Sequence, residues 1–488
     1  MRTHARAGHR SKGCAVSRGD QQLRFNDWFC GAGGATQGAH AVPGIEPVLA
    51  ANHDKLAIET HSTNFPGVEH FRGDIQNLDI ARHPYAEIFW ASPECTNWSA
   101  AKGRKADYAA HPGLFDNPEP EDGVVRSRAL MQDVVRYLRG MDTRHQPVLA
   151  GIVENVIDIR KWIHWDRWLA GIETLGYRTR LIALNSAHAA PHRTPRAPQS
   201  RDRLYLAYWH QSLGRDPDWD RWLRPECRCA SCEQTVQGIQ TWKRPGQDMG
   251  RYGSQYYYRC PNTDCHGARA EPFYLPAATA IDWTIPGQRI GDRDRPLSPK
   301  TMTRIQAALK KWKPTITETT TARNTNDLLP TSTTALLVPV EGREGKQAMP
   351  TDRPLRTQTT RNDLALLTMP HSPLMPYYGA SRPGTPTDQT MGTPTTACHQ
   401  PLLEPPPTDI MDCLFRMLEP HEIGAGMAFL PDYVVCGSKR QQVRQYGNAV
   451  TPPVAEILVS ALAECIQGHD IDWTHPSQLA ETLDGSPL

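Results

Sequence analysis

Strand-and-turn units that recur through the first hundred residues constrain the fold of this chain more than any other feature. Short apolar runs predict buried strands at Leu23–Phe29, Pro47–Ala51 and Ile88–Ala91. Helices are expected at Ala35–Ala41 and Lys55–Asn64, and later at Arg126–Arg139. Further strands are expected at Val148–Val153, Tyr177–Asn185 and Leu204–Trp209. Alternating strands and helices are typical of a doubly wound α/β domain, which carries its ligand sites at the carboxyl ends of the strands.

The first turn is rich in glycine. Phe29-Cys30-Gly31-Ala32-Gly33-Gly34 follows directly on the first strand. Residues without a Cβ let backbone N–H groups approach a cofactor closely, but they also suit an ordinary tight turn between strand and helix. The spacing is not the full G-x-G-x-x-G pattern, so both interpretations stay open at this point.

Polar residues follow the next two units. The second strand ends at Asn52-His53-Asp54, where a carboxylate often holds the ribose hydroxyls of a nucleotide-like ligand. Asn52 or His53 occupies the expected position, with Asp54 beside them. The turn Gly73-Asp74-Ile75 offers a carboxylate that could receive an amine or a ring N–H. These residues therefore indicate one side of a cofactor site.

A cysteine stands just past the fourth strand. Pro93 stops that strand because proline has no N–H to give the sheet ladder, and Glu94 and Cys95 follow it. In α/β proteins the chemistry usually sits on such loops. A half-buried structural thiol is the alternative interpretation of Cys95.

Two later strand ends carry ionisable groups. Glu154 follows the strand Val148–Val153, and a carboxyl at the mouth of a buried strand should have a raised pKa, which suits proton donation. A helix cap is the alternative role for Glu154. Gln199-Ser200-Arg201-Asp202-Arg203 leads into the strand Leu204–Trp209. Alternating arginines share one face there and form a fork for a phosphate or a carbonyl oxygen.

The segment 211–410 does not have α/β character. Cys229 and Cys232 form one closely spaced pair, and Cys260 and Cys265 form a second. Two such pairs predict a structural zinc ribbon with four thiolate ligands, with Cys227 and His266 as competing ligands. Reduced cysteines in a loop are the alternative.

Beyond Pro296 a Thr-x-Thr-Thr unit recurs, and it indicates a repetitive β-rich insert. The four copies are Thr317–Thr320, Thr331–Thr334, Thr357–Thr360 and Thr393–Thr396. Leucine pairs follow the last three, at 336–337, 366–367 and 402–403. Arg356 and Arg361 are available there for phosphates, and a solvated spacer is the alternative.

Composition narrows the class of protein. The chain has 488 residues, 39% of them hydrophobic, and no apolar run approaches the roughly 20 residues that span a bilayer. We therefore expect a protein of two or three domains that does not enter a membrane. Twelve cysteines without a secretory signal favour a reducing cytoplasm. The formal net charge of +2 neither demands nor excludes a nucleic acid, although residues 1–19 form a basic segment without acids.

Taken in order, these segments resemble the cytosine-5 DNA methyltransferase family, most closely its phage-borne and actinobacterial members. The matching pieces are Phe29–Gly34, Gly73–Ile75, Pro93–Cys95, Glu154–Val156, Gln199–Arg203 and Arg444–Pro453. The resemblance covers about residues 22–210 and 411–465. It implies a Rossmann-like S-adenosylmethionine-dependent methyltransferase domain with a smaller, β-rich target-recognition domain.

The resemblance also implies roles for individual residues. Cys95 would attack carbon 6 of a flipped-out cytosine, Glu154 would protonate ring nitrogen 3, and Arg201 and Arg203 would hold the base and the catalytic loop. S-adenosylmethionine would lie against Phe29, Gly31, Gly33, Gly34, Asn52, His53, Asp74, Ile75, Pro93, Asn448 and Val450. Such chemistry agrees with first principles, because an aromatic carbon is a poor nucleophile until a thiolate adds next to it.

Two departures and two rival functions accompany the resemblance. The family usually has Pro-Cys-Gln where this chain has Pro93-Glu94-Cys95, and Asn52 or His53 replaces the ribose carboxylate. Double-stranded DNA is the expected substrate. An RNA cytosine-5 methyltransferase and a DNA-binding relative without catalysis are the alternatives. We expect a monomer in the cytoplasm of a bacterial or phage-infected cell, with a cognate restriction endonuclease as a further partner to be sought.

The expected division of the chain follows from the same segments. A basic tail (1–21) precedes a catalytic and cofactor-binding domain (22–210). A target-recognition region (211–410) contains the zinc ribbon at 227–266. The chain then returns to the catalytic domain (411–468), with helices expected at Asp412–Leu418 and Val454–Cys465, and a tail (469–488) follows.

Overall fold

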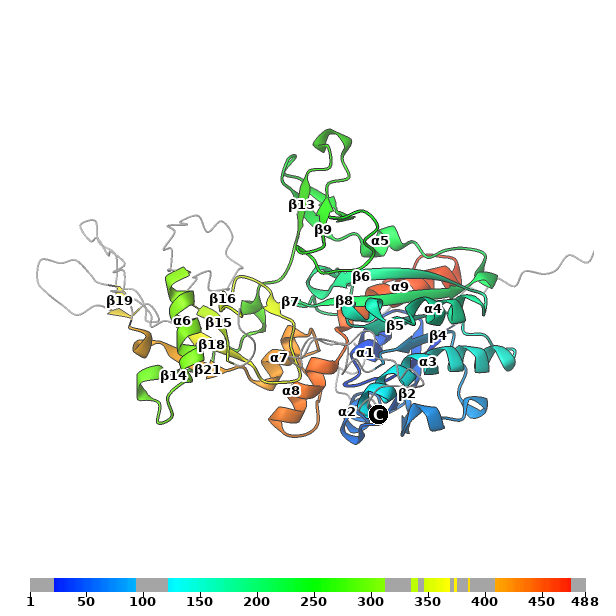
Figure 1. Ribbon diagram of the computed structural model, residues 1–488, viewed down its shortest axis with the longest axis horizontal. Coiled ribbons are helices and arrows are strands. Elements are labelled where there is room, and N and C mark those ends of the chain that lie inside the picture. The colour runs from blue at the N-terminus through cyan, green and yellow to red at the C-terminus, as the bar shows by residue number, and fades with distance from the viewer. Residues whose placement is uncertain are drawn as a thin grey trace, which may run out of the picture.

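The computed structural model describes residues 22–93, 122–311, 335–340, 346–368, 373–374, 385–386 and 409–474. Cys95, the first two and the last Thr-x-Thr-Thr units, the expected basic tail (1–21) and residues 475–488 of the expected C-terminal tail lie outside these ranges. Figure 1 shows one large sheet with helices on both sides, a smaller sheet around β9 and β13 projecting above it, and a third sheet at the far end of the molecule.

The large sheet has seven strands in the order β3-β2-β1-β4-β5-β8-β6. They are β1 (Leu23–Trp28), β2 (Ile45–Asn52), β3 (Glu69–Arg72), β4 (Ile88–Ala91), β5 (Ala150–Asn155), β6 (Tyr177–Asn185) and β8 (Asp202–His210). The strands from β3 to β5 are parallel, whereas β8 runs antiparallel to both β5 and β6. The predicted α/β architecture is confirmed, with a mixed rather than a wholly parallel sheet.

The strand order reverses between β1 and β4, which are neighbours in the sheet but not in the sequence. The chain moves outward through β2 and β3 from one side of this point and through β5 from the other. Loops that leave adjacent strands in opposite directions open a crevice at their carboxyl ends, which is where open α/β sheets bind ligands. The loops after Trp28 and Ala91 flank this crevice.

Helices cover both faces of the sheet. On one face, α3 (Asp122–Thr143) and α4 (Trp165–Glu173) pack against a core that includes Trp28 and Phe89. On the other face, α1 (Gly34–His40) and α9 (Pro452–Gln467) pack together. The remaining described helices are α2 (Lys55–Asn64), α5 (Trp219–Leu223), α6 (Pro299–Lys311), α7 (Pro420–Gly426) and α8 (Lys439–Asn448).

The seven-stranded sheet and the helices on its two faces form what we call the first lobe. Helix α9, from the C-terminal part of the chain, completes this lobe. Nearly all its residues are buried, as expected for a helix that is apolar all round. Among the described residues, the stretch Lys439–Gln467 is long and apolar enough to cross a membrane, but its most apolar window is 94% buried within the protein. Its apolar character is therefore explained by packing against the sheet.

A second sheet, which we call the four-cysteine sheet, has the strand order β10-β9-β13-β12-β11. Its strands are β9 (Glu226–Cys229), β10 (Thr235–Gln237), β11 (Ile239–Trp242), β12 (Tyr256–Arg259) and β13 (Arg269–Pro272). It packs on the first lobe, because Tyr256, Tyr258 and Met249 belong to the same buried cluster as Trp28. The Nε2 of Gln240 also donates to the carbonyl of Ala183 in β6 at 2.9 Å.

A third sheet contains the leucine pairs of two of the predicted repeats. Its strand order is β14-β21-β18-β15-β16, from β14 (Gln288–Arg289), β15 (Ala335–Pro339), β16 (Met349–Pro350), β18 (Leu364–Thr368) and β21 (Leu414–Met417). The leucine pairs of two repeats face each other, with Leu336 opposite Leu367 and Leu337 opposite Leu366. Short pairings also join β17 (Leu355–Arg356) to β7 (Gln199–Ser200), and β19 (Pro373–Leu374) to β20 (Thr385–Pro386).

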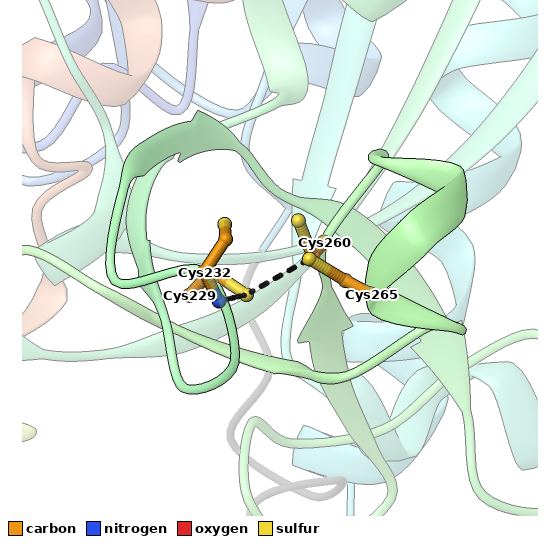
Figure 2. Close-up of side chains that lie close together, drawn as sticks. All are labelled: Cys229, Cys232, Cys260 and Cys265. Carbon is orange, nitrogen blue, oxygen red and sulfur yellow. Dashed lines mark hydrogen bonds between the residues drawn. The ribbon is translucent and has the colours of Figure 1, made fainter.

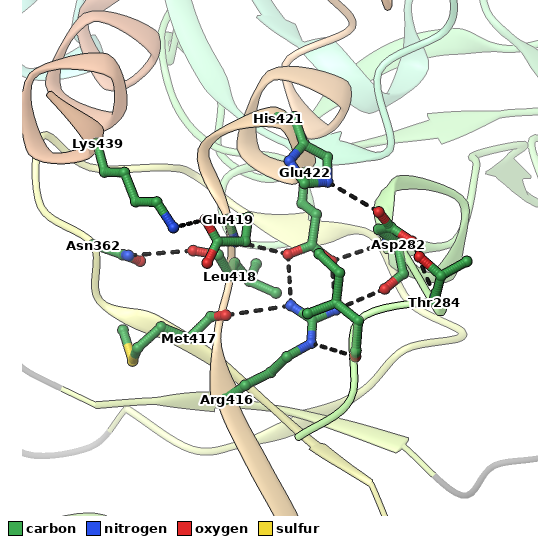
Figure 3. Close-up of polar contacts among 11 residues, drawn as sticks. Asp282, Thr284, Asn362, Arg416, Met417, Leu418, Glu419, His421, Glu422 and Lys439 are labelled. Carbon is green, nitrogen blue, oxygen red and sulfur yellow. Dashed lines mark hydrogen bonds and ion pairs between the residues drawn. The ribbon is translucent and has the colours of Figure 1, made fainter. Parts of the chain in front are cut away.

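A buried ion pair joins the third sheet to α7 (Figure 3). Arg416 of β21 donates to both carboxylate oxygens of Glu422 at 2.7 Å. The same guanidinium donates to the carbonyls of Asp282 and Ile285 at 2.9 and 3.1 Å. Removing one partner of such a pair would leave an uncompensated buried charge. The pair therefore fixes the loop at 282–285 and the start of α7 to one strand.

The helix predicted at Asp412–Leu418 is wrong. A single 3₁₀ turn, η10 (Ile410–Asp412), precedes the strand β21 (Leu414–Met417). Cys413 and Phe415 are buried, and β21 pairs with β18 on one side and β14 on the other. Pairing with strands far away in the sequence overrides the local helical preference of this short segment.

Close contact between α1 and α9 generates a first testable prediction. A Cβ on Gly38 would lie 2.6 Å from the Cβ of Ala455 and 2.8 Å from the backbone nitrogen of Glu456. We expect Gly38→Ala to lower the free energy of unfolding by about 1–3 kcal/mol, the usual cost of overpacking, measured by urea denaturation. Gly67→Ala is the matched control, since no atom lies within 4 Å of its added Cβ. Equal stability of both variants would contradict the close packing.

Candidate active site

A cavity of about 220 Å³ opens at the carboxyl ends of β1, β4 and β5. It collects most of the residues predicted for catalysis and cofactor binding: Phe29, Gly31, Asn52, His53, Pro93, Glu154, Arg201, Arg203 and Asn448. Gly33, Gly34, Asp74, Ile75 and Val450 are not among its lining residues. Cys95 lies outside the described residues, and the chain preceding it is described up to Pro93.

The glycine turn depends on left-handed backbone conformations. Phe29, Gly31 and Gly33 have φ angles of 59°, 55° and 85°. Positive φ is uncommon for an aromatic residue, so Phe29 is held in place by its surroundings. A Cβ on Gly33 would strike the Tyr433 hydroxyl. Phe29 and Gly31 therefore line the cavity, whereas Gly33 leaves room for Tyr433 from the C-terminal part of the chain.

A buried carboxyl supports the turn from behind. Asp27 in β1 is 1% exposed, and its Oδ2 accepts the hydroxyl hydrogen of Thr36 at 2.8 Å. Thr36 Oγ1 lies 2.9 Å from Nε2 of the buried His61. Burial raises the pKa of Asp27 to about 7, and its Oδ1 has no hydrogen-bond partner. A carboxyl in this environment favours its neutral form at moderately acidic pH.

The second wall of the cavity comes from the end of β2. The side-chain oxygen of Asn52 accepts the N–H of Asp54 at 2.9 Å, and the carboxylate of Asp54 accepts the N–H of Leu56 at 2.8 Å. Asp54 thus caps α2, and it lines the cavity together with Asn52 and His53. The sequence analysis placed Asp54 only beside the expected position of Asn52 or His53, but in the structure Asp54 lines the cavity with them.

Asp74 and Ile75 lie one strand farther out. Asp74 accepts the N–H of Gln76 at 3.1 Å and caps the 3₁₀ turn η1 (Ile75–Asn77), and Ile75 is 2% exposed. The preceding residue, Gly73, donates its N–H to the carbonyl of Asn52 at 3.1 Å. These residues therefore sit next to the Asn52 wall without contributing to the cavity surface.

Glu154 and Arg203 form an ion pair in the cavity. Arg203 Nε lies 3.2 Å from Glu154 Oε1, and both side chains are largely buried. Burial raises the pKa of Glu154, and the positive charges of Arg203 and Arg201 partly oppose that effect. Glu154 is the fifth residue of β5 rather than a residue beyond its end. The paired carboxyl therefore retains its proton more readily than an exposed one.

Arg201 has a different arrangement from Arg203. It is 3% exposed and donates to three backbone carbonyls: Gln358 at 3.3 Å, Gly447 at 3.2 Å and Ala449 at 2.9 Å. The two arginines therefore do not form one fork. Arg203 pairs with Glu154, whereas Arg201 joins its own segment to the segments that contain Gln358 and Gly447–Ala449.

Sequence reasoning missed two sets of residues at this site. Asn155 donates from Nδ2 to the carbonyl of Pro93 at 3.2 Å, which fixes the last described residue before Cys95. Helix α8 adds Gln441, Arg444 and Gln445 to the cavity wall. With Asn448 they recur at helical spacing on one face, a signal that was available once α8 was recognised as a helix.

The four predicted metal ligands do come together (Figure 2). The sulfur atoms of Cys229, Cys232, Cys260 and Cys265 all lie within 4.8 Å of one another. Cys229 Sγ is 3.8 Å from Cys265 Sγ, close to the separation of about 3.8 Å that four 2.3 Å Zn–S bonds impose in a tetrahedron.

Neighbouring N–H donors favour the thiolate at Cys229, whereas burial raises the pKa of Cys260 and Cys265. The N–H groups of Cys232 and Ser231 point at Cys229 Sγ, at 3.5 and 3.3 Å, and they lower the pKa of Cys229 to about 6. Cys227 lies outside the cluster and packs in the core shared with the first lobe. His266 is likewise not part of it. The donor set thus suits a closed zinc site.

Comparison with known proteins identifies relatives of the chain. A family model described as C-5 cytosine-specific DNA methylase matches residues 23–464. The type II methyltransferase M.NlaX of Neisseria lactamica is 28% identical over 186 residues, which are 38% of this chain and 51% of that protein. The chain thus spans about half the length of this curated relative.

Solved structures with similar folds include two methyltransferases. The Entamoeba histolytica methyltransferase EhMeth matches with 12% identity and a TM-score of 0.46, over 91% of this chain and 98% of that one. A putative DNA modification methyltransferase encoded within an E. coli prophage matches with 15% identity and a TM-score of 0.43, over 91% of this chain and 99% of that one.

The buried Asp27 predicts a pH-dependent difference in stability. Its pKa is higher in the folded chain than in the unfolded one, so the folded state binds the proton more tightly and its stability falls as pH rises from about 4 to about 7. Asp27→Asn removes this titration. We expect the stability of the variant relative to wild type to increase across that range, by up to about 4 kcal/mol at about 1.4 kcal/mol per pKa unit.

Urea denaturation at several pH values measures this difference. Asp294→Asn is the control, because Asp294 is exposed and should give a difference that does not vary with pH. A pH-independent difference for Asp27→Asn as well would show that the Asp27 carboxyl is ionised in the folded protein.

Proposed function

The chain belongs to the C-5 cytosine-specific DNA methylase family, and we propose that it transfers a methyl group from S-adenosylmethionine to carbon 5 of cytosine in double-stranded DNA. The observation that carries this proposal is the Glu154–Arg203 pair in the cavity beside Pro93. A buried carboxyl with a raised pKa is the group needed to protonate a ring nitrogen near neutral pH. The resemblance of the ordered motifs to phage-borne and actinobacterial members supports the same assignment.

Cys95 is the proposed nucleophile. It follows Pro93 by two residues, and consecutive Cα atoms are about 3.8 Å apart, so covalent geometry alone keeps its Cα within about 8 Å of that of Pro93. Pro93 lines the cavity and is held there by Asn155. The loop that carries the thiol therefore starts at the wall that also carries Glu154.

The proposed reaction uses these groups in sequence. The cytosine leaves the duplex, because its carbon 6 is not accessible within the stack. The Cys95 thiolate bonds to carbon 6, and the displaced electron pair is accommodated as Glu154 gives its proton to nitrogen 3. Carbon 5 thereby becomes nucleophilic and takes the methyl group. Loss of the carbon 5 proton to solvent then expels the Cys95 thiolate from carbon 6, and nitrogen 3 returns its proton to Glu154, which restores the aromatic ring and the acid.

S-adenosylmethionine supplies an electrophilic methyl group when bound, and the cavity fits it. Gly31 offers backbone without an obstructing Cβ at the turn, Phe29 lines the cavity beside it, and Asn52, His53 and Asp54 offer polar groups at the end of β2. We assign Asp74 and Ile75 to the adenine side, since Gly73 is bonded to Asn52. Pro93 and Asn448 would close the site, while Gly33, Gly34 and Val450 hold the turn against the returning chain.

DNA is favoured over RNA by the family to which the chain belongs. A catalytically inactive DNA-binding relative is disfavoured because Glu154 and Arg203 are paired in the cavity. The predicted division into a catalytic domain at 22–210 and 411–468 and a recognition region at 211–410 forms part of the proposal. So do a monomeric state, a cytoplasmic location in a bacterial or phage-infected cell, and a cognate restriction endonuclease.

Replacing the proposed acid should separate chemistry from binding. Glu154→Gln keeps the shape of the side chain but cannot donate the proton, so we expect single-turnover methyl transfer to slow by about 10²-fold or more. Cofactor affinity should change little. Tritium transfer from labelled S-adenosylmethionine to DNA, with rapid quenching, is the measurement.

Cys95→Ser is the companion variant and should abolish transfer while DNA binding persists. DNA with 5-fluorocytosine should trap the wild-type protein covalently and leave the serine variant free, because elimination requires a proton on carbon 5. An unchanged single-turnover rate in Glu154→Gln, or trapping of Cys95→Ser, would contradict the assigned roles.

The four cysteines should hold one structural Zn²⁺. Elemental analysis of purified wild-type protein should give one zinc per chain, and Cys232→Ser should lose it and unfold at a lower temperature, because a closed four-thiolate site contributes folding energy. Cys436→Ser is the matched control, since Cys436 lies outside the cluster and should retain the metal. Wild-type protein without zinc, purified under reducing conditions, would leave the cluster as four ordinary thiols.

A further inference from the structure

One turn of the four-cysteine sheet contacts both chain segments that carry the Glu154–Arg203 pair. This turn, Asp248–Tyr252, lies in the connection between β11 and β12. The first segment that it contacts is the 3₁₀ turn η4 (Ile157–Lys161), which begins three residues after Glu154. The second is Asp202, the residue between the two arginines of the cavity.

Two ion pairs of opposite polarity join the turn to η4. Arg251 lies 3.3 Å from Asp158, and Arg160 lies 2.9 Å from Asp248. Each partner thus offers one cation and one anion to the other. Such a reciprocal arrangement fixes the direction of the turn, because reversing it would bring Arg251 to Arg160 and Asp248 to Asp158, which are like charges.

A backbone hydrogen bond joins the same turn to Asp202. The N–H of Tyr252 donates to Asp202 Oδ1 at 3.0 Å. The ring of Tyr252 packs edge-on against His188 with centroids 4.4 Å apart, so the contact is shielded from solvent. The carbonyl of Asp202 in turn accepts a hydrogen bond from Arg203 at 3.0 Å. The turn therefore contacts Asp202, and Asp202 contacts the Arg203 guanidinium that pairs with Glu154.

We propose that the turn Asp248–Tyr252 is a positioning element that holds Glu154 and Arg203 in register for proton transfer. The inference rests on the proposed function, and it assigns to the four-cysteine sheet a role in the reaction that differs from reading a DNA sequence. None of the residues 248–252 lines the cavity, and the turn reaches the Glu154–Arg203 pair through Asp158, Arg160 and Asp202.

The ion pairs of the turn contribute to geometry more than to stability. Arg160, Asp248 and Arg251 keep between a third and just over half of their side-chain surface exposed, and ion pairs of this kind stabilise a fold only slightly. The chain should therefore still fold when they are removed. A displacement of about 1 Å at a reacting group can nevertheless cost about 10²-fold in rate.

The test uses full-length protein carrying Asp248→Asn together with Arg251→Met. Hydrogen exchange, followed by mass spectrometry without DNA or cofactor, should be at least about tenfold faster in peptides that cover residues 150–161 and 199–206. Methyl transfer should show a kcat lowered by roughly tenfold or more, with the KM for S-adenosylmethionine unchanged, because only the reacting geometry is disturbed.

Two single variants calibrate the result. Arg251→Lys retains the charge and should restore both exchange and kcat toward the wild-type values. Arg228→Met removes an arginine from the same sheet whose ion pair, with Glu233, is exposed, and it should change neither. Wild-type exchange and kcat in the double variant would overturn the inference, as would a raised KM at unchanged kcat. Absence of methyl transfer by the wild-type protein would overturn only the proposed function, since the exchange measurement is independent of it.

Discussion

The guanidinium of Arg201 is the point on which the architecture around the cavity depends. It is buried and donates to carbonyls of Gln358, Gly447 and Ala449, which belong to chain segments about 90 residues apart. A Cβ on Gly447 would strike the backbone of Thr359, so the two segments meet where only glycine fits. The described Thr-x-Thr-Thr unit, Thr357–Thr360, is thereby docked beside the cavity rather than serving as a spacer.

Burial and charge shift the pKa of Glu154 in opposite directions, and the net shift is upward, as a proton donor requires. Burial favours the protonated carboxyl, while Arg203 at 3.2 Å favours the ionised one. The pKa of Glu154 remains raised, so the effect of burial outweighs that of the two arginines. Placing the pair on two antiparallel neighbours, β5 and β8, keeps both groups on rigid strands.

Local patterns predicted the strands and the site positions that follow them, because each depends on a few adjacent residues. The helix at Lys55–Asn64 and the strand at Tyr177–Asn185 have the predicted bounds. The error at 412–418 arose because strand pairing with β18 cannot be seen locally. In the same way, spacing predicted that Cys229 would join its three partners, but not that their sheet packs against Asp202.

Completion of the cavity requires two parts of the chain that are far apart in the sequence. The strands up to β8 supply Glu154 and Arg203, whereas α8 supplies the wall with Gln441 and Arg444. Helix α9 then covers α1, and its fit depends on the missing side chain of Gly38. A chain that ended before α8 would keep the ion pair but would lack that wall and the carbonyls of residues 447 and 449 that bind Arg201. The strands of the four-cysteine sheet and of the third sheet thus lie, in the sequence, between two parts of one site.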